Sequence, residues 1–294
     1  MKQVVVLSGK GGTGKTTVVA GLAHLASRDG SLILVDADVD APNLELLLQP
    51  QVIAETPFYS SKVAEIAQTE CLRCGDCQAI CRFEAVVQND GDYWVDPVAC
   101  EGCASCYYAC PGGAIQMHEH LDGQWYHSAT RFGTLFHARL EAGAENSGKM
   151  VSTLRQQALF RSHEEQADWI IVDGGPGTGC PVIAAVTGAD LAVLVSEPTV
   201  SGVHDLKRAM GICDHFRVPV LVCVNKCDIN PAVAQEIVDY CRQRAVSVVA
   251  RVPYNEIVLT SIQRSCAVTE LNDNVVAREI QNLWVAVRGR LAKT

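Results

Sequence analysis

The chain has 294 residues, of which 48% are hydrophobic and 19% are charged, so it can bury a sizeable core and wholesale disorder is excluded. Its net charge of −9 argues against tight binding to nucleic acid or anionic lipid, because both require clustered lysine and arginine. We find no signal peptide pattern and no apolar run of about 18 residues. We therefore expect a soluble, cytoplasmic protein that binds neither nucleic acid nor membranes.

A glycine-rich loop over residues 9–17 follows the apolar run 4–7, which predicts a buried first strand. The loop fits the spacing G-x-x-x-x-G-K-[ST] of a phosphate-binding loop. Its glycines let backbone N–H groups approach phosphate oxygens, Lys15 adds a positive charge, and the Thr16 hydroxyl can bind Mg²⁺. A helix predicted over 17–27 directs its positive end at the same anion. The residues expected to bind nucleotide are Gly11, Gly12, Thr13, Gly14, Lys15, Thr16 and Thr17.

Lys10 is a second lysine in this loop, directly after its first glycine, and the ordinary phosphate cradle does not need it. A loop of this kind resembles the deviant Walker A motif of the MinD, ParA, Mrp and nitrogenase iron protein superfamily of ATPases. The resemblance implies ATP and ADP as ligands. It also implies a nucleotide-dependent homodimer, or a heterodimer with a related ATPase, in which Lys10 reaches the nucleotide of the partner subunit. Lys10 and Lys15 are then expected to be catalytic.

A second buried strand is predicted over 32–35, and Asp36 and Asp38 follow it. The strand–helix–strand order makes the two strands parallel, so both carboxylates lie at the strand end where ligands bind. In the family that the loop resembles, an aspartate at the position of Asp38 positions or activates the attacking water, and Asp36 supports the magnesium site. We therefore expect Asp38 to be catalytic. A turn and a short helix over 44–48 complete this segment.

The composition changes between residues 56 and 123, where eight of the 14 cysteines follow the spacing C-x₂-C-x₂-C-x₃-C twice, as an internal repeat. This pattern is typical of two-cluster bacterial ferredoxins, in which the fourth cysteine of each half binds the cluster of the other half. Zinc is the alternative, but it needs only two C-x₂-C pairs. Arg82 also departs from the family, which has proline after the fourth cysteine. The expected ligands are Cys71, Cys74, Cys77 and Cys110 for one [4Fe–4S] cluster, and Cys81, Cys100, Cys103 and Cys106 for the other.

Strand and helix patterns resume after the cysteines, with a strand predicted over 130–140 and a helix over 150–160. We assign no role to the polar loop 145–149 between them. A buried strand over 169–172 ends in Asp173, whose position resembles that of the Walker B aspartate that holds Mg²⁺ through water. The glycines after it resemble a switch loop that senses the third phosphate. The residues expected around Mg²⁺ are Thr16, Asp36, Asp38 and Asp173.

Further strands are predicted over 191–195, 219–225 and 246–252, with a helix over 201–215. The second of these strands ends in Asn225, which resembles the adenine-contacting residue of the superfamily, because an amide can donate to and accept from a base edge. Pro253 is expected to line the base. The run Asn225, Lys226, Cys227 and Asp228 also fits the Asn-Lys-x-Asp signature of guanine binding, so GTP is the alternative to ATP.

The last predicted helix, 274–291, has an apolar stripe that favours packing in the core. The alternative is a helix that touches a membrane through this stripe, with Arg278, Arg288, Arg290 and Lys293 on its polar side. The six other cysteines show no ligand spacing, and we expect most of them to be buried. The residues of the stripe are Val276, Ile280, Leu283, Trp284 and Val287.

Together these motifs resemble a deviant-Walker P-loop ATPase of the MinD superfamily with an inserted ferredoxin domain. We expect an α/β fold with a mostly parallel sheet flanked by helices over 1–55 and 124–294, and an α+β ferredoxin-like domain over 56–123. The expected function couples ATP hydrolysis and dimer rearrangement to low-potential electron transfer toward an unknown redox or metallocofactor protein. The alternative is an ATP-gated carrier or assembly protein for iron–sulfur clusters or metallocofactors.

Overall fold

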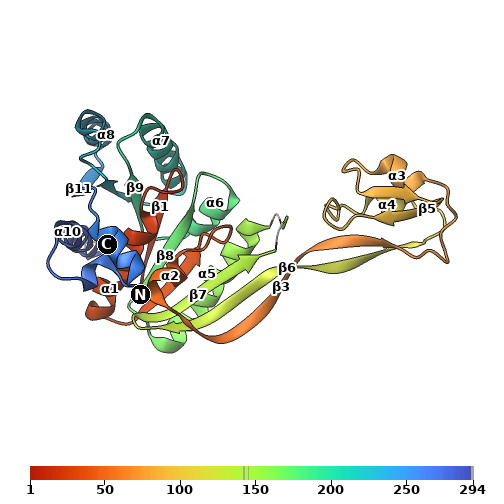
Figure 1. Cartoon of the computed structure of the whole chain (residues 1–294), viewed down its shortest axis with the longest axis horizontal. Helices are drawn as coiled ribbons and strands as arrows, with labels where there is room; N and C mark the ends of the chain where they lie inside the picture. Colours follow the sequence, from red (N-terminus) through yellow and green to blue (C-terminus); the bar gives the residue numbers. More distant parts are fainter. Residues whose placement is uncertain (142, 145, 293–294) are drawn as a thin grey trace. The chain divides into compact units, whose positions relative to one another are not determined.

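The computed structural model describes residues 1–141, 143–144 and 146–292 of the chain (Figure 1). These residues form two compact units. Unit 1 consists of Met1–Thr56, Trp125–Arg139 and Ser147–Thr294, and unit 2 consists of Pro57–Gln124 and Leu140–Asn146. Unit 2 thus includes a segment near residue 140 that lies outside the expected insertion, 56–123.

The strands of the main sheet are β1 (Lys2–Ser8), β2 (Leu32–Ala37), β3 (Gln51–Ile66), β6 (Ile115–Thr130), β7 (Gly133–Leu140), β8 (Trp169–Pro176), β9 (Leu191–Ser196), β10 (Val220–Asn225) and β11 (Ser247–Val252). Within the described chain their order is β11-β10-β9-β1-β8-β2-β7-β6-β3. The neighbours from β11 to β7 pair in parallel. The expected α/β fold with a mostly parallel sheet is therefore confirmed.

Helices cover both faces of the parallel strands (Figure 1). On one face α1 packs against α10, the 3₁₀-helix η1 and α2, and on the other α5, α6, α7 and α8 contact one another in sequence. Strands covered on both sides are mostly apolar, and β2 and β9 are buried at every residue, including the polar Asp36 and Ser196 near their carboxyl ends. The helices of unit 1 are α1 (Lys15–Asp29), α2 (Leu44–Leu48), α5 (Ser147–Glu165), α6 (Cys180–Val186), α7 (Val200–His215), α8 (Pro231–Gln243), α9 (Ile257–Gln263), η1 (Val268–Glu270) and α10 (Val275–Leu291).

Two predictions in the middle of the chain need correction. The strand predicted over 130–140 begins three residues later, as β7 at Gly133, because Thr130 ends β6 and the chain turns between Thr130 and Gly133. Gly133 has a φ of 146° and lies so close to β2 that a Cβ atom would come within 2.1 Å of the Leu32 carbonyl oxygen. The loop predicted over 145–149 is helical from Ser147 on, whereas Glu145 lies outside the described residues.

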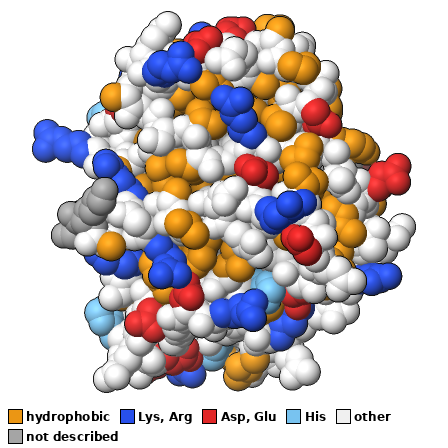
Figure 2. Space-filling model, turned by 90° about the vertical axis from the view of Figure 1, so that its left-hand side faces the viewer, with side chains coloured by type: hydrophobic (Ala, Val, Ile, Leu, Met, Phe, Trp, Pro, Cys, Tyr) orange, Lys and Arg blue, Asp and Glu red, His pale blue; other side chains and the backbone are white. Residues whose placement is uncertain are grey.

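The apolar stripe of α10 is buried, as predicted, and packs with residues of α1 and β11 in the core of unit 1. The membrane-touching alternative would need this stripe at the surface. On the face shown in Figure 2, lysine and arginine side chains alternate with acidic ones and do not form one basic field. Lys293, part of that alternative, lies outside the described residues. Within the described chain, no helix combines the length and apolar composition needed to cross a lipid bilayer.

The internal repeat of the sequence is also present in the backbone of unit 2. Equivalent positions of its two halves share the left-handed conformation: Arg73 and Gly102 have φ of 56° and 62°, and Gly75 and Ala104 have φ of 82° and 60°. In each half this conformation precedes a short helix. The antiparallel hairpin of β4 and β5 lies between the halves in sequence. The elements are α3 (Asp76–Ile80), β4 (Val86–Asn89), β5 (Asp92–Val95) and α4 (Ser105–Ala109).

A buried carboxylate joins the two long strands where they belong to unit 2. Asp122 of β6 is 2% exposed and accepts hydrogen bonds from the backbone N–H groups and hydroxyls of Ser60 and Ser61 on β3, at 2.5–2.7 Å. Burial alone raises the pKa of Asp122, but the hydrogen bonds from Ser61 and Ser60 outweigh it and lower the pKa to about 2. The carboxylate therefore stays charged above this pH and holds the strand pair together.

Trp284 should be a major contributor to the stability of unit 1. Its side chain is 4% exposed, its ring packs edge-on against Trp169 with centroids 4.8 Å apart, and its Nε1–H donates to Asp29 at 2.7 Å. We expect Trp284→Ala to lower the free energy of unfolding by about 3–5 kcal/mol. The neighbouring Val285 is 67% exposed, so Val285→Ala should change it by less than about 0.5 kcal/mol. Chemical denaturation of both variants checks this, and equal effects would contradict it.

Candidate functional site

The glycine-rich loop connects β1 to α1 at the carboxyl end of the parallel sheet, as its sequence predicts. Gly12 and Gly14 have φ of 77° and 88°, a conformation that side chains strongly disfavour. The loop is held by Asn225 at the end of β10, whose amide donates to the Thr13 carbonyl oxygen at 2.7 Å. A Cβ atom on Gly14 would lie 2.2 Å from that amide nitrogen. The loop conformation and the position of Asn225 therefore depend on each other.

Lys15 brings the predicted residues of three strands together. Its ammonium group lies 2.5 Å from Asp173 Oδ1 and 3.5 Å from Asp38 Oδ2 beyond β2. Asp173 lies within β8, which continues to Pro176, past the predicted strand 169–172. The side chain of Lys15 is only 6% exposed. Burial alone lowers the pKa of Lys15, but the adjacent Asp173 and Asp38 carboxylates outweigh it and raise the pKa. The site therefore holds a permanent positive charge at its centre.

Asp36 organises the segment around Asp38. Its two carboxylate oxygens accept hydrogen bonds from the backbone N–H groups of Asp38 at 3.1 Å and Leu44 at 3.2 Å. Burial, together with the nearby Asp173 charge, raises the pKa of Asp36. Because both of its oxygens contact the backbone, Asp36 positions Asp38 and the start of α2. This arrangement gives Asp36 a supporting place beside the Mg²⁺ region.

The residues near Lys15 fit a magnesium ion by the chemistry of their donors. Asp173 Oδ2 is buried and has no hydrogen-bond partner among the described residues. Buried polar atoms without partners are rare, and a carboxylate oxygen is a ligand that Mg²⁺ or its bound water prefers. Thr16 lies in the first turn of α1, directly after Lys15, and lines a cavity together with Lys15 and Asp38. Thr16 and Asp173 are therefore the residues that can hold the ion.

A cavity of about 530 Å³ extends from the loop toward α9 and α10. Asn225 and Pro253 line it, as expected for a base site, together with apolar residues such as Val258 and Ile280. Asp228, which would read guanine in an Asn-Lys-x-Asp site, is not among the lining residues, and its carboxylate accepts a hydrogen bond from the backbone N–H of Tyr254 at 2.7 Å. The arrangement therefore favours adenine. The predicted loop residues Gly11, Gly12, Thr13, Gly14, Lys15, Thr16 and Thr17 also line the cavity.

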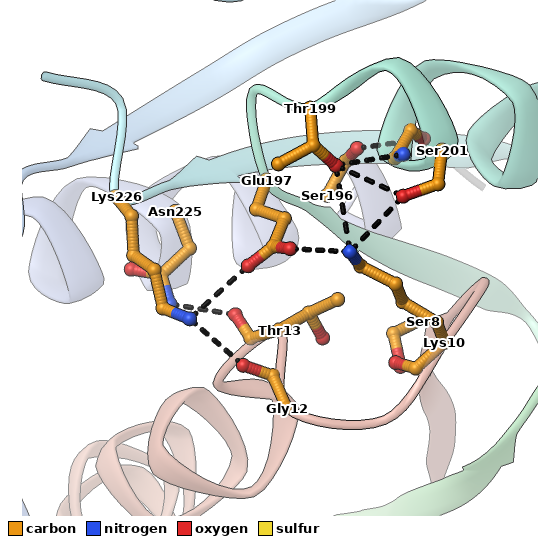
Figure 3. Close-up of polar contacts among 11 residues, drawn as sticks. Ser8, Lys10, Gly12, Thr13, Ser196, Glu197, Thr199, Ser201, Asn225 and Lys226 are labelled. Atoms are coloured by element: carbon orange, nitrogen blue, oxygen red, sulfur yellow. Dashed lines mark hydrogen bonds and ion pairs between the residues drawn. The ribbon is translucent and has the colours of Figure 1, made fainter. Parts of the chain in front are cut away.

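Lys10 lies at the edge of this site and contacts residues that the sequence analysis did not identify (Figure 3). Its ammonium group is 2.6 Å from Glu197 Oε1, and it also donates to Ser201 Oγ at 3.1 Å and Thr199 Oγ1 at 3.4 Å. The second oxygen of Glu197 pairs with Lys226 at 3.1 Å. Burial alone raises the pKa of Glu197, but the two lysines outweigh it and lower the pKa. Only its position could have indicated a role for Glu197 from the sequence, because Glu197 directly follows β9 at the ligand-binding edge of the sheet.

The eight cysteines of the repeat line two cavities within unit 2, and each cavity is lined by one of the predicted ligand sets. Apolar residues complete the walls, among them Ile66 and Tyr93 in the first cavity and Val86 and Val95 in the second. Each set contains three cysteines from one half of the repeat and one from the other, as the ferredoxin spacing predicts. The first cavity is lined by Cys71, Cys74, Cys77 and Cys110, and the second by Cys81, Cys100, Cys103 and Cys106.

Backbone groups near these thiols also point toward sulfur. The N–H of Arg73 donates to Cys71 Sγ at 3.4 Å, and the N–H of Ala114 donates to Cys110 Sγ at 3.3 Å. Burial raises the pKa of the Cys77 and Cys106 thiols, so a metal that binds them must displace a proton. In the part of the chain that the structure describes, no three His, Cys, Asp or Glu side chains are grouped closely enough to hold a single metal ion.

The six other cysteines vary in burial. Cys213, Cys223 and Cys241 are buried, and burial raises the pKa of Cys213 and Cys223 to about 12. These three are apolar packing residues, as expected. Cys227 and Cys266 are partly exposed, and Cys180 is exposed. The expectation that most of the six are buried is thus met by only half of them.

Known proteins resemble this chain in sequence and in fold. The profile of the CobQ/CobB/MinD/ParA nucleotide binding domain, CbiA, matches residues 4–266. An uncharacterized protein of Methanocaldococcus jannaschii is 34% identical over 228 residues, which cover 78% of this chain and 79% of the relative. The structure of MinD from Pyrococcus horikoshii complexed with Mg-ADP has a TM-score of 0.58 at 16% identity, covering 97% of this chain and 95% of the other.

An ATP complex of a McdA variant from Cyanothece has a TM-score of 0.60 at 16% identity, covering 99% of this chain and 96% of the other. At these identities the two solved structures show the fold alone. The family profile, in contrast, covers most of the chain, and the relative from Methanocaldococcus jannaschii is matched over most of its own length at about twice their identity. The protein therefore belongs to the CobQ/CobB/MinD/ParA nucleotide-binding family and is a P-loop ATPase of the MinD/ParA type.

Proposed function

We propose that this ATPase couples ATP hydrolysis and nucleotide-dependent dimerisation to low-potential electron transfer toward a partner protein. One observation carries the proposal: a single chain contains a nucleotide site built around Lys15 and two cavities that are each lined by four cysteines. The nucleotide site accounts for hydrolysis. The interleaved cysteines account for the redox role.

The contacts of Lys15 suggest how the site responds to ATP. Its ammonium group is paired with Asp173 and Asp38, and phosphate oxygens would compete with these carboxylates for the same charge. Once Lys15 turns to phosphate, Asp173 and the Thr16 hydroxyl can hold Mg²⁺, and Asp36 keeps its supporting contacts with the backbone. Bound Mg²⁺ supplies charge neutralisation at the phosphates.

Asp38 is the residue that we assign to the attacking water. Its side chain is 15% exposed, so it can reach both the cavity and the Lys15 ammonium group. Burial raises the pKa of Asp38 and Lys15 opposes this effect. When Lys15 moves to phosphate, the Asp38 carboxylate becomes free to accept a hydrogen bond from water and orient it for attack. The assignment of Lys10 to the nucleotide of a second subunit completes the hydrolytic site.

The two cysteine sets fit [4Fe–4S] clusters because each cavity offers four thiols, apolar walls and, at Cys71 and Cys110, backbone N–H donors to sulfur. Bound clusters supply one-electron transfer. The protein's own contribution is to hold the thiols around each cavity, to exclude water with residues such as Ile66 and Val86, and to tune the potential through N–H donors.

An ATP-gated carrier of clusters or metallocofactors is the alternative. In each cavity the ligands come from both halves of the repeat, so a cluster leaves only if the two halves separate. This interleaving favours resident clusters and therefore electron transfer. It is the feature on which the choice between the two functions depends.

The nucleotide site predicts different defects for three substitutions. Lys15→Ala should weaken ATP binding by roughly 10- to 100-fold, because it removes a charge-assisted contact. Asp38→Ala should bind ATP but hydrolyse it on the order of 10²-fold more slowly. Lys10→Ala should lose turnover together with ATP-dependent dimerisation. ATPase assays, nucleotide binding and sedimentation measure these effects, with the exposed Asp40→Ala as the control. A strictly monomeric Lys10→Ala protein with normal turnover would contradict the assignment of Lys10.

Paired cysteine substitutions test the interleaved ligand sets. The anaerobically purified chain should contain about eight iron ions. Cys71→Ser with Cys110→Ser removes two ligands from one cavity and should leave about half of the iron. Cys71→Ser with Cys81→Ser removes one ligand from each cavity and should lose nearly all of it. Iron analysis and EPR distinguish these results. If the Cys71→Ser, Cys110→Ser protein lost nearly all of its iron and the Cys71→Ser, Cys81→Ser protein kept half, interleaving would be excluded. About one zinc per four cysteines, without charge-transfer absorption, would exclude iron–sulfur clusters.

Isotope labelling distinguishes electron transfer from cluster transfer. The reduced protein, loaded with iron-57, is mixed with ATP and a candidate acceptor, and the two proteins are then separated. We expect oxidation that requires hydrolysable ATP, with the label retained on this chain, because the ligand sets interlock. The Lys15→Ala protein loaded with the same label serves as the control. Label that appears on the acceptor, with loss of cluster absorbance here, would favour the carrier.

A further inference from the structure

Glu197 joins two lysines that belong to different parts of the nucleotide site (Figure 3). One oxygen lies 2.6 Å from the Lys10 ammonium group, in the glycine-rich loop, and the other lies 3.1 Å from the Lys226 ammonium group, after β10. The Glu197 side chain is 12% exposed, whereas the two lysines are 34% and 29% exposed. One carboxylate is thus shared by a loop lysine and a lysine next to Asn225.

Lys10 contacts a group of acceptors that follows β9. An ammonium group has three N–H donors, and Lys10 has three acceptors: Glu197, Thr199 and Ser201. Thr199 and Ser201 lie at the start of α7, directly after Glu197. Lys10 is therefore satisfied locally and must give up these contacts before it can reach a nucleotide in another subunit.

Asn225 and Lys226 line the end of the cavity that would bind the base, which we call the base end. Lys226 connects this end to the Glu197 carboxylate. Lys226 donates to the Gly12 carbonyl oxygen at 2.9 Å as well as pairing with Glu197. Asn225 donates to the next carbonyl oxygen, that of Thr13, at 2.7 Å. A base that bonds to Asn225 takes over this amide, and both side chains line the cavity that the nucleotide would fill. Occupation of the base end therefore alters the contacts that secure the loop and Glu197.

We propose that Glu197 is a positioning residue that retains Lys10 on its own chain until nucleotide binds. Nucleotide at Asn225 and Lys226 weakens the shared ion pair and releases Lys10 for the second subunit. This inference rests on the proposed role of Lys10 in dimerisation. Partly exposed ion pairs are individually weak, so nucleotide binding is sufficient to open this one.

Chemical labelling of lysine tests the retained state without requiring a dimer. The full chain is treated with limiting acetic anhydride, and the acetylation of Lys10 and Lys226 is measured by peptide mass spectrometry relative to Lys2. Glu197→Gln should label faster at both lysines, on the order of fivefold, because the amide carries no charge to hold them. Glu164→Gln, which alters a surface ion pair with Arg161, should not change their labelling. Equal labelling of Lys10 in the wild type and Glu197→Gln overturns the proposal.

Nucleotide binding should increase the labelling of Lys10, as the substitution Glu197→Gln does. With ADP bound, as verified by equilibrium dialysis, the labelling of Lys10 in the wild type should rise toward that of the Glu197→Gln protein. Unchanged or reduced labelling of Lys10 with bound ADP overturns the link between the base end and Lys10. In the Glu197→Gln protein, the labelling of Lys10 should rise little further when ADP binds, since Lys10 is already released.

Sedimentation then tests the consequence for assembly. The ATP-dependent dissociation constant of the dimer should fall on the order of fivefold in Glu197→Gln, and this gain should disappear in the double variant with Lys10→Ala. A gain that persists without Lys10 overturns the proposal, because Glu197 would then act through another residue. If the wild type does not dimerise with ATP under any condition, the proposed function fails in that respect, and the labelling of Lys10 alone decides whether Glu197 retains it.

Discussion

The ion pair between Lys15 and Asp173 is the interaction on which the rest of the nucleotide site depends. A lysine that is 6% exposed is unfavourable unless a carboxylate compensates its charge, and Asp173 does so at 2.5 Å. This pairing requires the loop after β1 to lie beside Asp173 of β8. The strand order β1-β8-β2 provides this placement and brings Asp38 to the other side of the same ammonium group. Strand order and charge placement therefore support each other.

The same positive charges serve two sets of partners. Lys15 pairs with Asp173 and Asp38, Lys10 pairs with Glu197, and Lys226 pairs with Glu197 and donates to a loop carbonyl oxygen. These pairs balance three ammonium groups with three carboxylates. In the proposed mechanism, ATP displaces these carboxylates from the lysines when it binds. The site is thus organised for exchange between two charge arrangements, which is what a switch requires.

The cysteine sites are likewise built from residues that lie far apart in the sequence. Each cavity combines thiols from both halves of a repeat, and the paired left-handed positions of the two halves give both the same turn before a short helix. Ala104 shows that the second half keeps this conformation without glycine. In unit 1, Asp36 accepts hydrogen bonds from the backbone at Asp38 and at the start of α2. The chain continues from there into β3. The proposed coupling would use this covalent path.

The sequence by itself determined the local chemistry: the glycine-rich loop, the buried strands, the acids that follow them and the interleaved cysteine spacing. These features depend on residue type and short-range order, which a single sequence displays directly. Tertiary structure decided the rest. The sequence did not indicate the turn before Gly133, since apolar alternation continues through it, nor the sixteen-residue lengths of β3 and β6. It did not identify Glu197 either, because its partners Lys10 and Lys226 are distant in the chain and meet only where β1, β9 and β10 lie side by side. Which charges neutralise one another is a property of packing, and no local pattern encodes it.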